Sequence, residues 1–187
     1  DKPQFLSDYP KKTNAKKDTL IRKTTVSSPI WSENGELAVV VVSSADNKDR
    51  WIMQLDPTSG QLKNLDHQHD EAWIGGPGIG GGFGSGNIGW LDNQTIYFQS
   101  EADGYSHLYT LNVITNEKKQ LTKGKYEVQN LTLARDKQSF YLTTNQVHPG
   151  EQHFYKIPKN GGELIKLTGM EGGNTCTVSP DETHFVN

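Results

Sequence analysis

The sequence predicts an all-β fold, a partial β-propeller of about three and a half four-stranded antiparallel blades. Three observations lead to this prediction: an internal repeat, hairpin turns at fixed places within each repeat, and an almost complete absence of helical periodicity. Each repeat opens with an apolar anchor, a polar tight turn and a β-rich run. The four anchors are Trp31, Trp90, Leu133 and Val178, which are separated by 59, 43 and 45 residues.

A second part of the repeat supports this alignment. The stretch RWIMQLDPTSGQLKNL at residues 50–65 matches residues 107–122 and 153–168. In each, a run of alternating side chains enters a turn rich in Asn, Gly, Pro or Thr, and a short strand follows that ends in Leu. A period near 43 residues with roughly four short strands is typical of a propeller blade.

The repeat divides the chain into an N-terminal arm and an incomplete ring. We expect residues 1–27 to form a polar linker and residues 28–187 to form the partial propeller, because a closed ring needs at least about four blades. The expected blades are residues 28–66, 87–122 and 126–168, with residues 174–187 opening another and residues 67–86 forming a glycine-rich loop between blades.

Composition excludes several function classes. The 187 residues carry a net charge of −3 with nineteen basic and twenty-two acidic side chains, so no field of one sign indicates nucleic-acid binding. A single cysteine excludes an intrachain disulfide and any site built from several cysteines. No apolar run is long enough to span a membrane, and the polar start predicts either a chain made without a signal peptide or a piece of a longer precursor.

The stretch IGGPGIGGGFGSGNIGW at residues 74–90 holds nine of the nineteen glycines. It contains the pattern G-x-G-x-x-G twice, but a turn and a strand follow where a dinucleotide site needs a helix. Ser85 lacks the flanking glycines of a nucleophile elbow, since Phe83 and Asn87 stand there. We expect a mobile loop between blades; a rim loop that faces a catalytic domain or substrate through Trp73 and Phe83 is the functional alternative.

Histidines occur in two kinds of context. His67 and His69, in the stretch HQHDE, could bind a divalent metal, but two imidazoles without a third ligand favour a solvated loop. His107 and His153 occupy one repeat position, filled by Trp51 in the first blade, which indicates a structural role. We therefore expect no metal, no cofactor and no catalytic residue in this chain.

The segment IYFQSEADGYSHLYTLNVITNEKKQLTKGKYEV at residues 96–128 resembles the end of the propeller in the prolyl oligopeptidase family (S9) of serine peptidases, and is most similar to the dipeptidyl peptidase IV type. The match continues through QHFYKIPKNGGELIKLT and NTCTVSPDETHFVN. The resemblance implies an N-terminal propeller paired with a C-terminal α/β-hydrolase domain that carries a catalytic Ser, Asp and His. It also implies peptide substrates. None of the catalytic elements is present, and no adjacent Glu-Glu pair holds a substrate amino group.

The resemblance therefore implies a non-catalytic propeller fragment of a dipeptidyl aminopeptidase IV-like serine peptidase, which gates and shapes access of peptides to the separate hydrolase domain. Expected contacts to the substrate chamber or the hydrolase domain are Trp73, Phe83, Glu101 and Tyr105. We expect a periplasmic or otherwise exported location in a bacterium, with a cytoplasmic location as the alternative. We also expect self-association through exposed blade edges. The alternative is a free-standing WD40-type or TolB-type propeller that acts as a protein- or glycan-binding scaffold.

Overall fold

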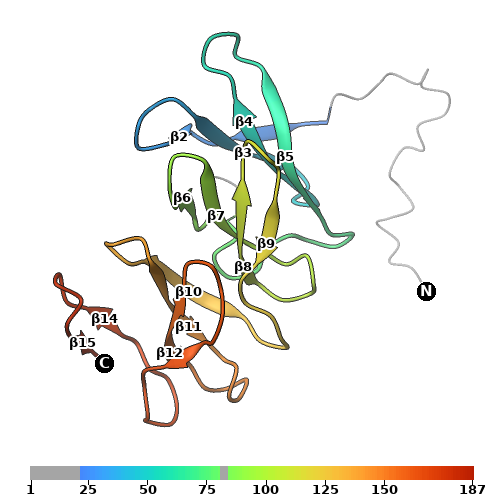
Figure 1. Ribbon diagram of the computed structural model, residues 1–187. Helices are drawn as coiled ribbons and strands as arrows, with labels where there is room; N and C mark the ends of the chain where they lie inside the picture. Colours follow the sequence, from blue (N-terminus) through green and yellow to red (C-terminus); the bar gives the residue numbers. More distant parts are fainter. Residues whose placement is uncertain (1–21, 81–83) are drawn as a thin grey trace, which may run out of the picture.

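The computed structural model of the chain describes residues 22–80 and 84–187, and these residues form four antiparallel sheets (Figure 1). The first sheet contains β1 (Thr24–Val26), β2 (Ile30–Trp31), β3 (Ala38–Ser44), β4 (Asp49–Leu55) and β5 (Leu62–His69). The second contains β6 (Ile88–Trp90), β7 (Thr95–Ser100), β8 (His107–Asn112) and β9 (Lys118–Gln120). The third contains β10 (Val128–Leu133), β11 (Ser139–Thr144), β12 (His153–Pro158) and β13 (Ile165–Lys166), and the last pairs β14 (Thr177–Val178) with β15 (Phe185–Val186).

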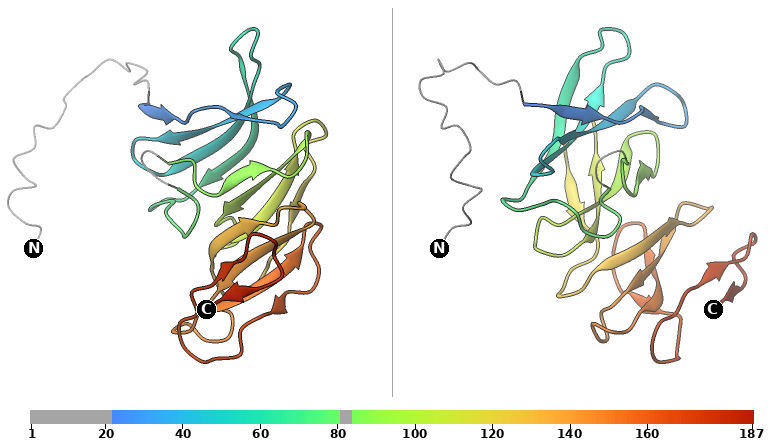
Figure 2. Two further views of the ribbon diagram at one scale, coloured as in Figure 1. Left: turned by 90° about the vertical axis from the view of Figure 1, so that its left-hand side faces the viewer. Right: turned by 180° about the vertical axis from the view of Figure 1, so that it is seen from behind.

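The predicted all-β partial propeller is confirmed. Within the second and third sheets the strands follow one another in chain order, as in a propeller blade. The four sheets follow one another along an open arc, and the last lies far from the first (Figure 2). No part of the chain that the structure describes forms a helix long and apolar enough to cross a membrane.

Two expected boundaries differ from the structure. Strand β1 lies inside the expected N-terminal arm, because Thr24, Thr25 and Val26 are β-branched and pair with the end of β3. Residues 1–21 of the arm lie outside the described residues. Strand β5 continues to His69, so the expected loop at 67–86 begins three residues too early; the end of this strand is polar because it lies at the rim of the sheet.

A hydrophobic core lies at each junction between consecutive sheets. The core between the first and second sheets includes Ile52, Ile96 and Phe98, each fully buried. The next contains Leu108, Phe140 and Leu142 on the facing surfaces of the second and third sheets, and a smaller one links the third sheet to the last. Because each blade buries its two faces against neighbouring blades, the fold is stabilised by these contacts along the arc.

The described residues of the connection between the first and second sheets, on either side of residues 81–83, are packed and hydrogen-bonded. The amide of Asn87 donates to the carbonyl of Gly78 (2.6 Å), and Ile79 between them is fully buried. The carbonyl of Pro77 accepts from the side chains of Gln99 (3.1 Å) and Ser106 (2.7 Å) in the second sheet.

Glycine is required in this connection because its backbone segments lie very close together. Gly86 has a φ of +73°, and a Cβ atom there would lie 2.3 Å from the carbonyl oxygen of Ile79. Gly78 has a φ of +69°, and a Cβ atom there would overlap the side-chain oxygen of Gln99 at 2.0 Å. The glycines therefore allow close packing and left-handed backbone conformations that other residues disfavour.

Arg50 on β4 holds this connection from the side of the first sheet. Its side chain is buried, and it donates to the carbonyls of Ser85 (2.9 Å) and Gln99 (3.3 Å) and to the side-chain oxygen of Gln68 (3.2 Å). Burial lowers the pKa of Arg50 to about 10, although the nearby Asp66 acts in the opposite direction. A single cation thus bonds to the first sheet, the second sheet and the connection between them.

Candidate functional site

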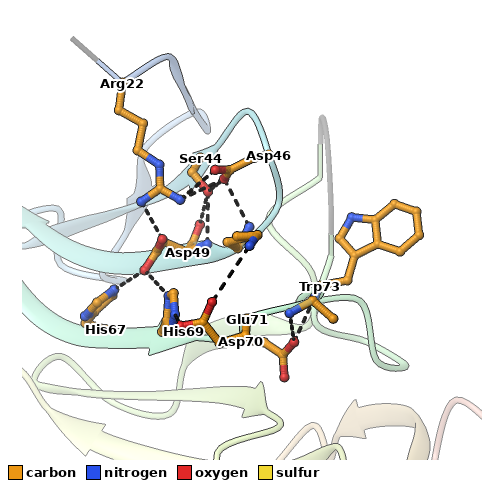
Figure 3. A network of polar contacts seen from close by, with 11 residues as sticks. Arg22, Ser44, Asp46, Asp49, His67, His69, Asp70, Glu71 and Trp73 are labelled. Atoms are coloured by element: carbon orange, nitrogen blue, oxygen red, sulfur yellow. Dashed lines mark hydrogen bonds and ion pairs between the residues drawn. The ribbon is translucent and has the colours of Figure 1, made fainter. Parts of the chain in front are cut away.

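A cluster of polar side chains lies at one rim of the first sheet, where β4 begins and β5 ends (Figure 3). Asp49 and Trp51 are two residues apart on β4 and share one face, and His67 and His69 do the same on β5. The strand register sets Asp49 opposite His69 and Trp51 opposite His67, so the four side chains form one cross-strand group.

A β-bulge in β5 decides which face these histidines occupy. Next to the hairpin turn, Met53 pairs with Asn64, but Ile52 pairs with Asp66, which leaves Leu65 as the extra residue. Leu65 enters the core between the first two sheets. Without the extra residue the ladder would set Gln68 opposite Asp49 and turn both histidines to the other face.

Asp49 is the centre of the cluster. Its Oδ1 atom lies 2.6 Å from Nε2 of His67 and 2.8 Å from Nδ1 of His69, and its Oδ2 atom lies 2.5 Å from Nη1 of Arg22. The carboxylate is 5% exposed, whereas both imidazoles are almost half exposed. Burial raises the pKa of Asp49, but hydrogen bonds from His67, His69 and Arg22 outweigh it and hold the pKa at about 2.

The tight turn between β3 and β4 positions this carboxylate. The hydroxyl of Ser44 accepts from the amide of Asp49 (2.9 Å) and donates to Asp46 (2.6 Å), which also binds Arg22 (2.8 Å). Hydrogen bonds from Ser44 and Arg22 keep the pKa of Asp46 well below its usual range. Asn47 has a φ of +56°, a conformation that asparagine tolerates in turns.

His69 has a second acidic neighbour. Its Nε2 atom lies 3.3 Å from Oε1 of Glu71, while Nδ1 faces Asp49. Hydrogen bonds to Asp49 and Glu71 raise the pKa of His69. The ring of His67 stacks on Trp51 with centroids 5.1 Å apart and an interplanar angle of 4°, which fixes its orientation.

The cluster borders a pocket with a volume of about 400 Å³. The end of β5, Ile74 and the loop between β7 and β8 line it, and that loop contributes Glu101. Glu101 also accepts a hydrogen bond from the amide of Gly75 (3.2 Å). The pocket therefore lies between the first and second sheets, with imidazoles on one side and a carboxylate on the other.

Of the four contacts expected from the sequence, the structure brings Glu101 to this pocket. Trp73 is 69% exposed and its ring points away from the cluster (Figure 3). Tyr105 is partly buried and does not line the pocket. Phe83 lies outside the described residues.

His107 and His153 have the structural surroundings expected for residues that recur once per blade. His107 is fully buried with Nδ1 2.9 Å from the hydroxyl of Thr122, and His153 is buried with Nδ1 3.2 Å from the hydroxyl of Thr168. Each threonine oxygen also accepts a backbone amide of the strand that carries the histidine. In each blade the histidine and the threonine therefore join the third strand by hydrogen bonds to the segment that follows the fourth strand.

Asp49 and Arg22 are members of the site that the sequence analysis does not identify. The spacing of His67 and His69 places both imidazoles on one face of any strand, but the residue opposite them depends on the strand register. Within residues 22–80 and 84–187, Asp49, His67 and His69 are the one group of three acidic, histidine or cysteine side chains whose ligand atoms lie within 4.8 Å of one another.

Comparison with known proteins identifies the family. The sequence pattern of the dipeptidyl peptidase IV (DPP IV) N-terminal region matches residues 7–187. A protein named "probable dipeptidyl peptidase 4" from Aspergillus flavus is 31% identical over 137 residues, covering 72% of this chain and 16% of the relative. Its namesake from Aspergillus fumigatus is 29% identical over 130 residues, covering 69% of this chain and 15% of the relative.

The solved structure of Porphyromonas gingivalis dipeptidyl peptidase 4 has a similar fold, with a TM-score of 0.63 at 16% sequence identity. The likeness covers 84% of this chain and 22% of that protein. The chain thus spans less than a quarter of the length of the relatives that it matches. The match over nearly all of the chain and the shared fold agree: the chain belongs to the family of DPP IV N-terminal regions, as part of its β-propeller.

Proposed function

We propose that the chain is the non-catalytic propeller part of a DPP IV-like serine peptidase and gates the access of peptides to a separate α/β-hydrolase domain. The match to the DPP IV N-terminal region over residues 7–187 carries this proposal. The sequence contains no Gly-x-Ser-x-Gly elbow, so the nucleophile must come from another domain.

The open arc supports a role as part of a larger ring. Apolar side chains are exposed at both ends of the arc, including Val26 (58%) and Trp31 (47%) in the first sheet and Val186 (73%) in the last. Further blades would bury them. A complete ring in front of an active site admits extended peptides and excludes folded proteins by size.

The experiment compares the chain with a full-length peptidase that contains it. Chromogenic Gly-Pro and Ala-Pro dipeptides are offered to both, and we expect hydrolysis by the full-length protein and none by the 187-residue chain. Hydrolysis by the chain that a serine-directed inhibitor abolishes would refute the non-catalytic role.

Gating is tested with one substrate in two states. A small protein with an N-terminal Gly-Pro is offered to the full-length peptidase, first folded and then as a reduced, unfolded chain. We expect the folded form to be cleaved at least tenfold more slowly, because it cannot pass the propeller. Equal rates, with equal access of both N-termini to an unrelated aminopeptidase, would contradict gating.

The exposed ends also lead us to propose that the isolated chain self-associates. Light scattering over a hundredfold concentration range should show a rising mean mass. A strictly monomeric species at the highest concentration would contradict this.

A further inference from the structure

We propose that Asp49, His67 and His69 form a binding site for a divalent transition-metal cation, with zinc as the preferred ion. Two imidazole nitrogens and one carboxylate oxygen are a donor set that zinc uses when a fourth coordination position is left open. The three donor atoms lie within 4.8 Å of one another, so one ion can reach all of them. The proposal is independent of the peptidase role, since it concerns this blade alone.

The geometry needs a small adjustment to hold the ion. Tetrahedral zinc with ligands at about 2.0–2.1 Å separates neighbouring donor atoms by about 3.3 Å. The Oδ1 atom of Asp49 lies 2.6 Å from His67 and 2.8 Å from His69, so each of these pairs must separate by about 0.5–0.7 Å. The two imidazole nitrogens lie within 4.8 Å of each other and must also take up the spacing of about 3.3 Å. Both imidazoles are almost half exposed and can shift outward by this amount, His67 along the face of Trp51, while the buried carboxylate stays in place.

The side chains that contact the three proposed ligands resemble those that orient ligands in known metal sites. A metal-binding histidine commonly gives its other ring N–H to a carboxylate, and Nε2 of His69 faces Glu71 at 3.3 Å. Arg22 holds the second oxygen of Asp49, which leaves Oδ1 for the ion. Trp51 stacks on His67 and restricts its ring. The three ligands are thus oriented by neighbours from the strands and the adjoining segments.

The repeat shows that the fold does not require these residues. Counted by strand pairing, so that the bulge at Leu65 is included, Thr122 and Thr168 occupy the position of His67 in the other blades. There each bonds to the histidine that replaces Trp51. At the position of Asp49 the other two blades carry Tyr105 and Glu151, and at that of His69 they carry Gly124 and Met170. The other two blades share a threonine at the position of His67 and differ from each other at the positions of Asp49 and His69, so the repeat itself requires none of the three residues. Among the described residues, the three donor atoms come together in the first blade.

The local charge favours a dication. The network contains more carboxylates than cationic side chains: Asp46, Asp49, Asp70 and Glu71 against Arg22 and Lys48. A bound dication would balance this excess. Because His67 and His69 also line the 400 Å³ pocket, the open coordination position can face that pocket and the carboxylate of Glu101 across it.

The test measures metal binding by the 187-residue chain after treatment with a chelator. Titration calorimetry with Zn²⁺ near neutral pH should show one equivalent bound. His69→Ala and Asp49→Asn should each weaken binding at least tenfold, and Glu71→Gln should weaken it less. His184→Ala removes an exposed imidazole far along the chain and is the matched control, which should bind as the unaltered chain does.

Cobalt gives a readout that does not depend on stability. Co²⁺ bound in place of Zn²⁺ should produce a visible absorption spectrum typical of tetrahedral nitrogen and oxygen ligands, and His69→Ala should abolish it. Circular dichroism of each variant confirms that the β-sheets are retained. No stoichiometric binding by the unaltered chain would overturn the proposal and leave a purely hydrogen-bonded cluster. Binding that persists in a His67→Ala, His69→Ala double variant would also overturn it.

Discussion

Replacement of Gly86 by alanine should destabilise the chain by about 4 kcal/mol. The left-handed φ of +73° accounts for about 1 kcal/mol. The new Cβ atom would lie 2.3 Å from the carbonyl oxygen of Ile79 and 2.6 Å from that of Gly78, so the backbone must open. Opening breaks the bond between the Asn87 amide and Gly78, worth about 1 kcal/mol, and exposes Ile79, worth about 2 kcal/mol.

Two other glycines separate these contributions. Gly35 also has a φ of +73°, but a Cβ atom there meets nothing within 4 Å in the part of the chain that the structure describes, so Gly35→Ala should cost about 1 kcal/mol. Gly84 lies in the same connection without a positive φ, and among the described residues a Cβ atom there meets nothing within 4 Å, so Gly84→Ala should change stability by less than about 0.5 kcal/mol. Urea unfolding followed by tryptophan fluorescence gives the three values. Equal losses for the Gly86 and Gly35 variants would refute the close packing of the glycine-rich connection.

Four further predictions test the core, the repeat and the rim. Ile96→Ala should destabilise the chain by about 2–5 kcal/mol because the side chain is fully buried between two sheets, whereas Ile114→Ala, at a site 53% exposed, should have little effect in the same urea assay. Thr122→Val should cost about 1–3 kcal/mol, because it leaves the buried imidazole of β8 and a backbone amide without their partner; a thermal unfolding curve unchanged from that of the parent chain would contradict this. The pKa of Asp49 lies below its unfolded value, so its stabilisation should be complete above about pH 4 and decline as the pH falls towards 2. Asp49→Asn should flatten this part of a plot of melting temperature against pH, and an unchanged slope would count against the pairing. The raised pKa of His69 has the opposite sign: its contribution is present at acidic pH and is lost as the pH rises through the folded value, so His69→Ala should reduce stability more at pH 5 than at pH 8.

The repeat was sufficient to predict the fold because each blade depends on the same local pattern. An apolar anchor, a turn and a β-rich run recur whether or not the blade carries a site, and the hairpin turns mark where strands reverse. The sequence predicts a loop at the polar end of β5 because strand residues at a rim are solvated and show no alternation of apolar side chains. The conformation of the glycine-rich connection cannot be predicted from the sequence either. Composition alone does not distinguish a glycine that permits close packing from one in a flexible linker.

The rim cluster could not be predicted because it depends on strand register. Asp49 is twenty residues from His69 in the chain, and counting back from the hairpin turn sets Gln68 opposite it. The bulge at Leu65 shifts the pairing by one residue and turns the two histidines to the face of the aspartate. A one-residue irregularity, invisible as a sequence pattern, therefore decides whether the three side chains meet.

The buried guanidinium of Arg50 has a consequence for how the chain unfolds. Its Nε atom has no hydrogen-bond partner among residues 22–80 and 84–187, and its other nitrogens depend on acceptors in two sheets and in the connection that joins them. If the connection detached by itself, Arg50 would lose the carbonyl of Ser85 while still enclosed between the blades, and a poorly compensated buried charge is strongly unfavourable. We therefore expect the first two blades and the glycine-rich segment to open together as one cooperative unit, with their amides exchanging hydrogen at a common rate, while the blades nearer Asn187 can open independently.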